Sequence, residues 1–152
     1  FTLLSATFAR GDGGFGGPAG AGPAPHPIPE RKPDATTTLE TRKDQGLLYR
    51  LNGDRNPLHA DPELALRAGF PAPILHGLCT YGMACRAILQ TVVAYEHTRI
   101  TGFDVRFSAP VYPGESIATD IWVEGRTVSF RCRIPERDDI VAINNGRCTL
   151  AF

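Results

Sequence analysis

Residues 76–96 read HGLCTYGMACRAILQTVVAYE, the one long helical pattern in the sequence. Apolar side chains recur in this stretch at spacings of three and four residues, which predicts an amphipathic helix of about five turns. Gly82, Ala84 and Ala87 would keep the helix slim, so that a curved sheet could wrap around it. The predicted apolar stripe consists of Leu78, Tyr81, Cys85, Ile88, Leu89, Val92 and Val93.

The residues after this helix alternate between apolar and polar side chains, which is the pattern of half-buried strands. Strands are predicted over 98–109, 115–124, 128–134 and 140–152. One long helix followed by an antiparallel meander predicts an α+β domain with the helix on one face of the sheet. Arg131 and Arg133 alternate with the apolar residues of the third strand, and we expect them on a solvated face. Binding of phosphates by these two arginines is the alternative.

Residues 11–33 are rich in glycine and proline, with 7 of the 16 glycines and 6 of the 13 prolines in the chain. Such a stretch forms neither a helix nor a central strand. We therefore predict that residues 1–33 comprise a leading strand at about 2–10 and an overhanging connection. The folded domain is predicted over 34–152.

Two short helices are predicted before the long one. The first covers 39–51 and has leucines on its apolar side. These are Leu47, Leu48 and Leu51. The second begins after Asp61, a good N-cap, with Pro62 in the first helical position, and ends at Gly69.

Composition excludes several classes of protein. The chain has 152 residues, of which 42% are hydrophobic, and its 16 basic and 16 acidic side chains cancel. A net charge of zero gives no reason to expect a nucleic acid or an anionic membrane as a partner. No apolar run approaches the ~18 residues that span a bilayer. The four cysteines fit no zinc pattern, and we expect reduced core thiols.

The loop GDRNPLH, residues 53–59, carries the ionisable groups that no core position explains. Asp54 and His59 lie five residues apart in a turn-rich segment, where functional groups are common. Such a pair can hold one water, remove a proton from it and return a proton to carbon. The alternative, equally open on these residues alone, is that both side chains only stabilise the turn.

Three segments resemble one family. YRLNGDRNPLHADP, residues 49–62, resembles the hydratase 2 motif of the MaoC-like, (R)-specific 2-enoyl-CoA hydratases. PILHGLCTYG at 73–82 and RFSAPVYPG at 106–114 are similar to the segments that follow it in that family. GGFGG at 13–17 resembles the peroxisomal branch. The resemblance covers nearly the whole chain and is greatest to the C-terminal, motif-bearing half of hydratases with two hot-dog domains.

The resemblance implies a hot-dog fold, in which an antiparallel sheet wraps around one long helix. It also implies reversible hydration of trans-2-enoyl-CoA to (3R)-3-hydroxyacyl-CoA in fatty-acid or related acyl-CoA metabolism. It implies no metal and no redox cofactor, since coenzyme A is part of the substrate. Asp54 and His59 would be the catalytic pair, and the N–H of Gly77 would stabilise the thioester oxyanion. The substrate-binding residues implied are Asp54, Arg55, Asn56, Pro57, Leu58, His59, Gly77 and Phe107. We expect His76, beside Gly77, to cap or orient the start of the helix.

Two alternatives keep this fold. One is a dehydratase that acts on a carrier-protein-linked, polyketide-like or sterol side-chain thioester. The other is a non-catalytic half that only binds acyl groups, which the intact Asp54, Asn56 and His59 argue against. We expect a second hot-dog domain, in a preceding part of the natural polypeptide or in a partner chain of a dimeric assembly. We expect the protein in the cytoplasm of a bacterium, or in the peroxisome of a eukaryote.

Overall fold

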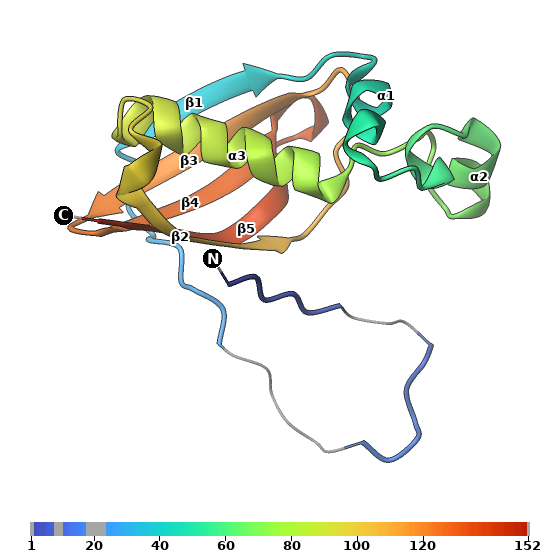
Figure 1. The fold of residues 1–152 in the computed structure, drawn as a ribbon, viewed down its shortest axis with the longest axis horizontal. Coiled ribbons are helices and arrows are strands. Elements are labelled where there is room, and N and C mark those ends of the chain that lie inside the picture. The colour runs from blue at the N-terminus through green and yellow to red at the C-terminus, as the bar shows by residue number, and fades with distance from the viewer. Residues whose placement is uncertain (1, 8–10, 18–23, 152) are drawn as a thin grey trace.

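The computed structural model describes residues 2–7, 11–17 and 24–151. An antiparallel five-stranded sheet, in the order β1-β3-β4-β5-β2, packs against one long helix, α3 (Figure 1). The strands are β1 Ala35–Glu40, β2 Ile100–Phe107, β3 Ser116–Glu124, β4 Thr127–Ile134 and β5 Ile140–Leu150, and the α-helices are α1 Gln45–Tyr49, α2 Pro62–Arg67 and α3 Gly77–Val92. The predicted α+β class, the long helix and the four strands after it are confirmed.

The core lies between α3 and the sheet. Ala84, Ala87 and Ile88 of α3 are fully buried, so the small residues bring the helix close to the strands. Phe130 of β4 is also fully buried, and a Cβ atom on Gly146 would lie 2.6 Å from its ring. Glycine at that position in β5 is therefore required by the packing. The strands contribute further fully buried large side chains, among them Ile117, Ile121, Trp122, Val128, Ile134 and Ile143.

Leu78 departs from the predicted apolar stripe. Its side chain is 63% exposed, although it lies in the first turn of α3. Cys79 and Thr80 are buried in that turn instead. The stripe therefore starts one residue later than the spacing indicates, and Leu78 faces away from the core.

The N-terminal predictions need correction. Residues 2–7 form no strand and are exposed, while residues 8–10 lie outside the described part of the chain. The first described strand is instead β1, with the sequence ATTTLE. Its β-branched threonines favour an extended backbone, and it pairs with β3 along its length. The predicted helix over 39–51 was wrong at its start, because Leu39 and Glu40 belong to this strand.

The first short helix is also shorter than predicted. α1 spans five residues and continues into a single 3₁₀ turn, Arg50–Asn52, which ends at Gly53 with φ of +107°. Its leucines were predicted to be an inner side and are exposed; they are Leu47, Leu48 and Leu51. The second short helix is confirmed. The Asp61 carboxylate accepts hydrogen bonds from the N–H groups of Glu63 and Leu64 at the start of α2.

The segment 26–34 crosses the face of the sheet opposite α3. The His26 side chain hydrogen-bonds the Ser129 hydroxyl at 2.8 Å, and the Trp122 indole N–H donates to the Arg31 carbonyl at 2.8 Å. The Asp34 carboxylate accepts from the N–H of Val123. Part of the predicted overhanging segment is therefore bound to the sheet of its own domain. β3 is buried at every residue from Ile117 to Trp122, because alternate residues face the core and this segment covers Trp122 on the other face.

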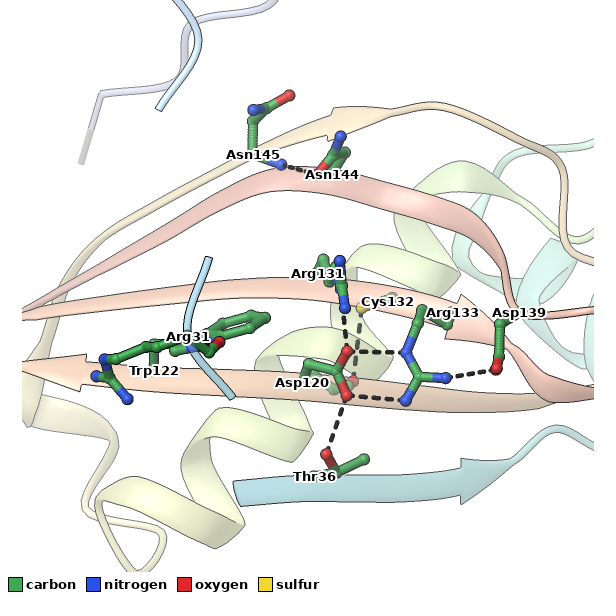
Figure 2. Close-up of polar contacts among 11 residues, drawn as sticks. Arg31, Thr36, Asp120, Trp122, Arg131, Cys132, Arg133, Asp139, Asn144 and Asn145 are labelled. Atoms are coloured by element: carbon green, nitrogen blue, oxygen red, sulfur yellow. Dashed lines mark hydrogen bonds and ion pairs between the residues drawn. The ribbon is translucent and has the colours of Figure 1, made fainter. Parts of the chain in front are cut away.

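A network of charges occupies the same outer face (Figure 2). Asp120 of β3 is 2% exposed, and its carboxylate accepts hydrogen bonds from Arg131, from Arg133 and from the Thr36 hydroxyl. Arg133 also pairs with Asp139. The two arginines lie on the outer face as predicted, but they are only partly solvated, because both guanidinium groups are held on a buried carboxylate. The alternative of phosphate binding is left without support for the same reason.

Asp120→Asn should lower the free energy of unfolding at pH 7 by about 2 kcal/mol, because Arg131 loses its charge partner and Arg133 keeps only Asp139. Burial alone would raise the pKa of Asp120, but the hydrogen bonds from Arg133 and Arg131 outweigh it and hold the pKa below its ordinary value. The stabilisation is therefore complete above pH ~4 and is lost as the pH falls through the lower pKa of the folded state.

Urea unfolding of both proteins between pH 3 and 7 measures this difference. The gap between the wild type and Asp120→Asn should narrow below pH ~4. Asp104→Asn is the matched control, because its ion pair with Arg147 is exposed and is worth at most about 1 kcal/mol. Equal losses in the two variants at pH 7 would contradict the importance of the buried network.

Candidate active site

The loop 53–59 is shaped by its own side chains. The Asp54 carboxylate accepts a hydrogen bond from the N–H of Asn56 at 3.2 Å. The Asn56 side chain in turn accepts from the N–H of Leu58 at 3.0 Å and caps the 3₁₀ turn Pro57–His59. Proline suits the first position of this turn, where no N–H is needed. The Asp-x-Asn-Pro spacing therefore fixes the local backbone that carries both Asp54 and His59.

His59 has a defined tautomer. Its Nδ1 lies 2.8 Å from the carbonyl oxygen of Ile74. A carbonyl oxygen can only accept, so Nδ1 carries the proton, and Nε2 of the neutral ring presents a lone pair. The ring is thus oriented as a base, with one nitrogen anchored to the backbone and the other available to a water molecule.

His76 lies directly before α3, and its side chain contacts the loop 53–59 at two places. Its ring stacks on that of His59, with centroids 3.7 Å apart and planes 27° apart. Its Nε2 donates a hydrogen bond to the Asp54 carbonyl oxygen at 3.2 Å. Burial lowers the pKa of His76, and the hydrogen bond to the Asp54 carbonyl offsets this only in part. His76 is the N-cap residue of α3, but its side chain makes no capping hydrogen bond, so the expected capping was wrong; that it orients the start of the helix stays a prediction.

Gly77 is the first residue of α3 and is exposed. Its N–H has no acceptor inside the helix, and it lies at the positive end of the helix dipole. Phe107, at the end of β2, covers this position: a Cβ atom on Gly77 would lie 3.5 Å from the Phe107 ring. The Phe107 ring is itself half exposed. Two predicted site residues that are thirty positions apart in the sequence are therefore neighbours.

The structure does not bring every predicted residue into contact. Within the described chain, no hydrogen bond or ion pair holds the Arg55 side chain, which is exposed. Pro57 is exposed and Leu58 is partly buried. These three residues belong to the loop 53–59, and their contact with substrate stays a prediction. His76 contacts both Asp54 and His59, which the sequence analysis did not predict. Its place directly before the predicted site residue Gly77 could have indicated that it lies at the site.

Asp54, His59 and His76 also form a group that could be considered for a metal ion, with ligand atoms within 4.8 Å of one another. Imidazole binds a metal through a lone pair in the plane of its ring, and zinc ligands converge on one point at ~2.0–2.2 Å. The two rings here are stacked and nearly parallel, so their lone pairs do not converge. The arrangement suits a water between Asp54 and His59 better than a metal ion.

The site is open on one side. A hollow of about 280 Å³ adjoins His59. It is lined by Lys43, Gly46, Leu47, Ala60, Ala72, Pro73, Tyr112 and Pro113. α1, α2 and the start of α3 lie at this end of the molecule (Figure 1), and each carries exposed leucines. A group of exposed apolar side chains beside a site is typical of a surface that further polypeptide covers.

A sheet packed on one long helix, with an Asp–His pair and a glycine at the helix start, defines a MaoC-like hot-dog domain. The chain belongs to this family: the family described as "MaoC like domain" matches residues 25–151. The enoyl-CoA hydratase ChsH3 of Mycobacterium tuberculosis is 46% identical over 147 residues, which are 95% of this chain and 50% of that protein. The peroxisomal multifunctional enzyme type 2 of Drosophila melanogaster is 47% identical over 87% of this chain and 23% of its own length.

A solved structure, the MaoC-like dehydratase from Phytophthora capsici, superposes with a TM-score of 0.86 at 40% identity. The superposed part is 93% of this chain and 48% of the chain in that structure. The hot-dog fold is thereby confirmed. The chain spans about half the length or less of the curated relatives it matches. Among the described residues, no helix has the length and apolar character needed to cross a membrane.

Proposed function

We propose that this domain catalyses the reversible hydration of trans-2-enoyl-CoA to (3R)-3-hydroxyacyl-CoA. The observation that carries the proposal is the fixed tautomer of His59 next to an acidic group, because a nitrogen of its ring lies within 4.8 Å of an Asp54 carboxylate oxygen. Relatives named enoyl-CoA hydratase and MaoC-like dehydratase support it, because the two names describe one reaction in opposite directions. A non-catalytic acyl-binding role is disfavoured by a site that is formed and oriented.

In this mechanism Asp54 and His59 hold one water molecule. His59 Nε2 takes a proton as the water oxygen bonds to C3 of the enoyl thioester, and the electron pair of the double bond moves toward the thioester oxygen. The N–H of Gly77 and the dipole of α3 stabilise the oxyanion. The pair then returns a proton to C2, so that H and OH are added and nothing is oxidised or reduced.

The substrate carries its own coenzyme A, and we propose no further cofactor and no metal. The acyl carrier can be coenzyme A or a carrier protein, since the chemistry at C2 and C3 is the same. We propose acyl-CoA, because the relatives named enoyl-CoA hydratase are similar over most of this chain. A second hot-dog domain, in the same polypeptide or in a dimer, would cover the open side of the site. The compartment, cytoplasmic or peroxisomal, stays a prediction.

Asp54→Asn and His59→Ala should each lower kcat by about 10²–10⁴, because each removes one partner of the reacting water. The double variant should lose far less than the product of the two, since the groups act as a unit. Thermal midpoints should change little, because Asp54 is exposed and His59 is only partly buried. The measurement is loss of the enoyl-thioester absorbance, together with a melting curve, in the polypeptide that carries this domain.

The matched control is His97→Ala, which removes an exposed histidine that lies outside the loop. It should leave both kcat and the melting temperature unchanged. Activity within threefold of wild type for either single variant would exclude that residue from the pair. A collapse of the melting temperature would instead support the alternative that Asp54 and His59 only stabilise the turn.

Gly77→Ala tests the oxyanion position. The new Cβ atom would contact the Phe107 ring without a clash, so the protein should fold, and alanine should favour the helix by about 0.5–1 kcal/mol. The methyl group would occupy the space where the thioester must approach the N–H, so kcat/KM should fall about 10- to 100-fold. Gly82→Ala is the control: its Cβ atom meets nothing within 4 Å, so stability should rise and activity should not change. Equal activity of the two variants would refute the role of Gly77.

Chelation tests the proposal that no metal takes part. Incubation with EDTA, followed by gel filtration, should leave the hydration rate within twofold of the untreated enzyme, because side chains activate the water. Metal content of the untreated enzyme is measured in parallel. A loss of activity that zinc restores would assign Asp54, His59 and His76 to a metal site, with the stacked rings rearranged.

A further inference from the structure

We propose that His76 is a positioning residue: it holds Asp54 and His59 in register by supporting both from the fixed start of α3. The proposal rests on the function proposed above, for which Asp54 and His59 are the reacting groups. His76 itself would touch neither the substrate nor the water. Its effect would pass through the loop that it supports.

His76 belongs to a rigid part of the molecule. Its side chain is 1% exposed, and its carbonyl oxygen accepts hydrogen bonds from the N–H groups of Cys79 and Thr80 in the first turn of α3. The preceding residue, Leu75, is buried and donates its N–H to the Val111 carbonyl at 2.7 Å. The backbone on both sides of His76 is therefore fixed by the core helix and by the segment before β3.

The loop 53–59 has few other attachments. In the described part of the chain, two hydrogen bonds tie it to residues far in sequence: His59 Nδ1 to the Ile74 carbonyl, and His76 Nε2 to the Asp54 carbonyl. Both end in the segment 74–76. The stacking of His76 on His59 adds a third contact. The His76 ring also packs against Tyr49, with ring centroids 4.7 Å apart. A single side chain thus contacts both ends of the loop.

The hydrogen bond fixes the tautomer of His76, while burial, which lowers its pKa, favours the neutral ring. Because a carbonyl accepts, Nε2 carries the proton, and Nδ1 of the neutral ring is buried without a partner among the described residues. A second proton would place a buried charge against the His59 ring. The groups that face His76 are Tyr49, Arg50, Asp54 and His59, and the exposed Asp54 carboxylate is the only acid among them. We therefore expect His76 to stay neutral while His59 takes up and releases its proton.

Three variants separate the two contacts of His76. His76→Gln keeps an amide N–H for the Asp54 carbonyl but loses the ring; His76→Phe keeps a ring against His59 but loses the donor; His76→Ala loses both. Since a misplacement of ~1 Å can cost ~10²-fold, kcat should fall about 100-fold in His76→Ala and about 10-fold in each of the others. KM should change less than threefold, and the limbs of the pH profile should be kept.

Cys132→Ala is the stability-matched control, because Cys132 is fully buried in β4 and lies on the sheet, away from the loop. It should lower the melting temperature without a change in kcat. Loss of one limb of the pH profile in the His76 variants would show that His76 itself transfers a proton. Activity within threefold of wild type in all three, or a kcat loss that the control reproduces, would overturn the positioning role.

A readout without substrate separates this proposal from the proposed function. Long-range ¹H–¹⁵N correlation spectra of the imidazole groups should show His59 as the Nδ1–H tautomer and His76 as the Nε2–H tautomer in the wild type. In His76→Ala the His59 resonances should broaden or show mixed tautomers. If the protein hydrates no enoyl thioester but these spectra hold, the reaction is misassigned and the support of the loop stands. Unchanged His59 resonances in His76→Ala would refute the support.

Discussion

The burial of α3 against the sheet is the constraint from which the site follows. Ala84, Ala87 and Ile88 have no exposed surface. This close packing fixes the distance of the helix from the strands and its rotation about its own axis. Its first turn is thereby fixed, and with it His76 and Gly77, which lie one after the other at the point where the chain enters the helix. The loop 53–59 is attached to this segment by two hydrogen bonds, one to the Ile74 carbonyl and one from the His76 ring. The position of this exposed loop is therefore set by its contacts with the residues at the start of the buried helix α3.

The outer face of the sheet supplies the opposing support. Most antiparallel sheets with one covered face leave the other to water, but here the segment 26–34 and the Asp120 network cover part of it (Figure 2). Side chains of β3 and β4 bind the segment, Trp122 at the Arg31 carbonyl and Ser129 at the His26 ring. Both faces of the sheet are therefore in contact with other parts of the domain, and the end of β2 that carries Phe107 is paired with β5 at Ile143.

Periodicity was enough to predict α3 and the four strands after it, because the pattern of each extends over eight or more residues. It failed for β1, whose six residues form a strand only by pairing with the distant β3, while the adjoining leucines imitate a helix face. The ionisable residues Asp54 and His59 stood out because a polar loop offers no structural reason for both. The stacking of His76 on His59 joins residues seventeen apart, and the binding of Arg131 and Arg133 to Asp120 joins two strands. Neither contact leaves a local signal.

The chemistry of the site also depends on what lies over it. Stabilisation of an oxyanion by one N–H and a helix dipole is strong in a dry site and weak in water. In this domain alone Gly77, Asp54 and Asn56 are exposed, and Phe107 covers Gly77 from one side only. The exposed leucines of α1, α2 and the first turn of α3 lie at the same end and give a covering domain apolar surface to bury. The domain thus sets the positions of Asp54, His59 and Gly77 by itself, whereas the proposed reaction would need a low dielectric, which the proposed covering domain would supply by packing on those leucines.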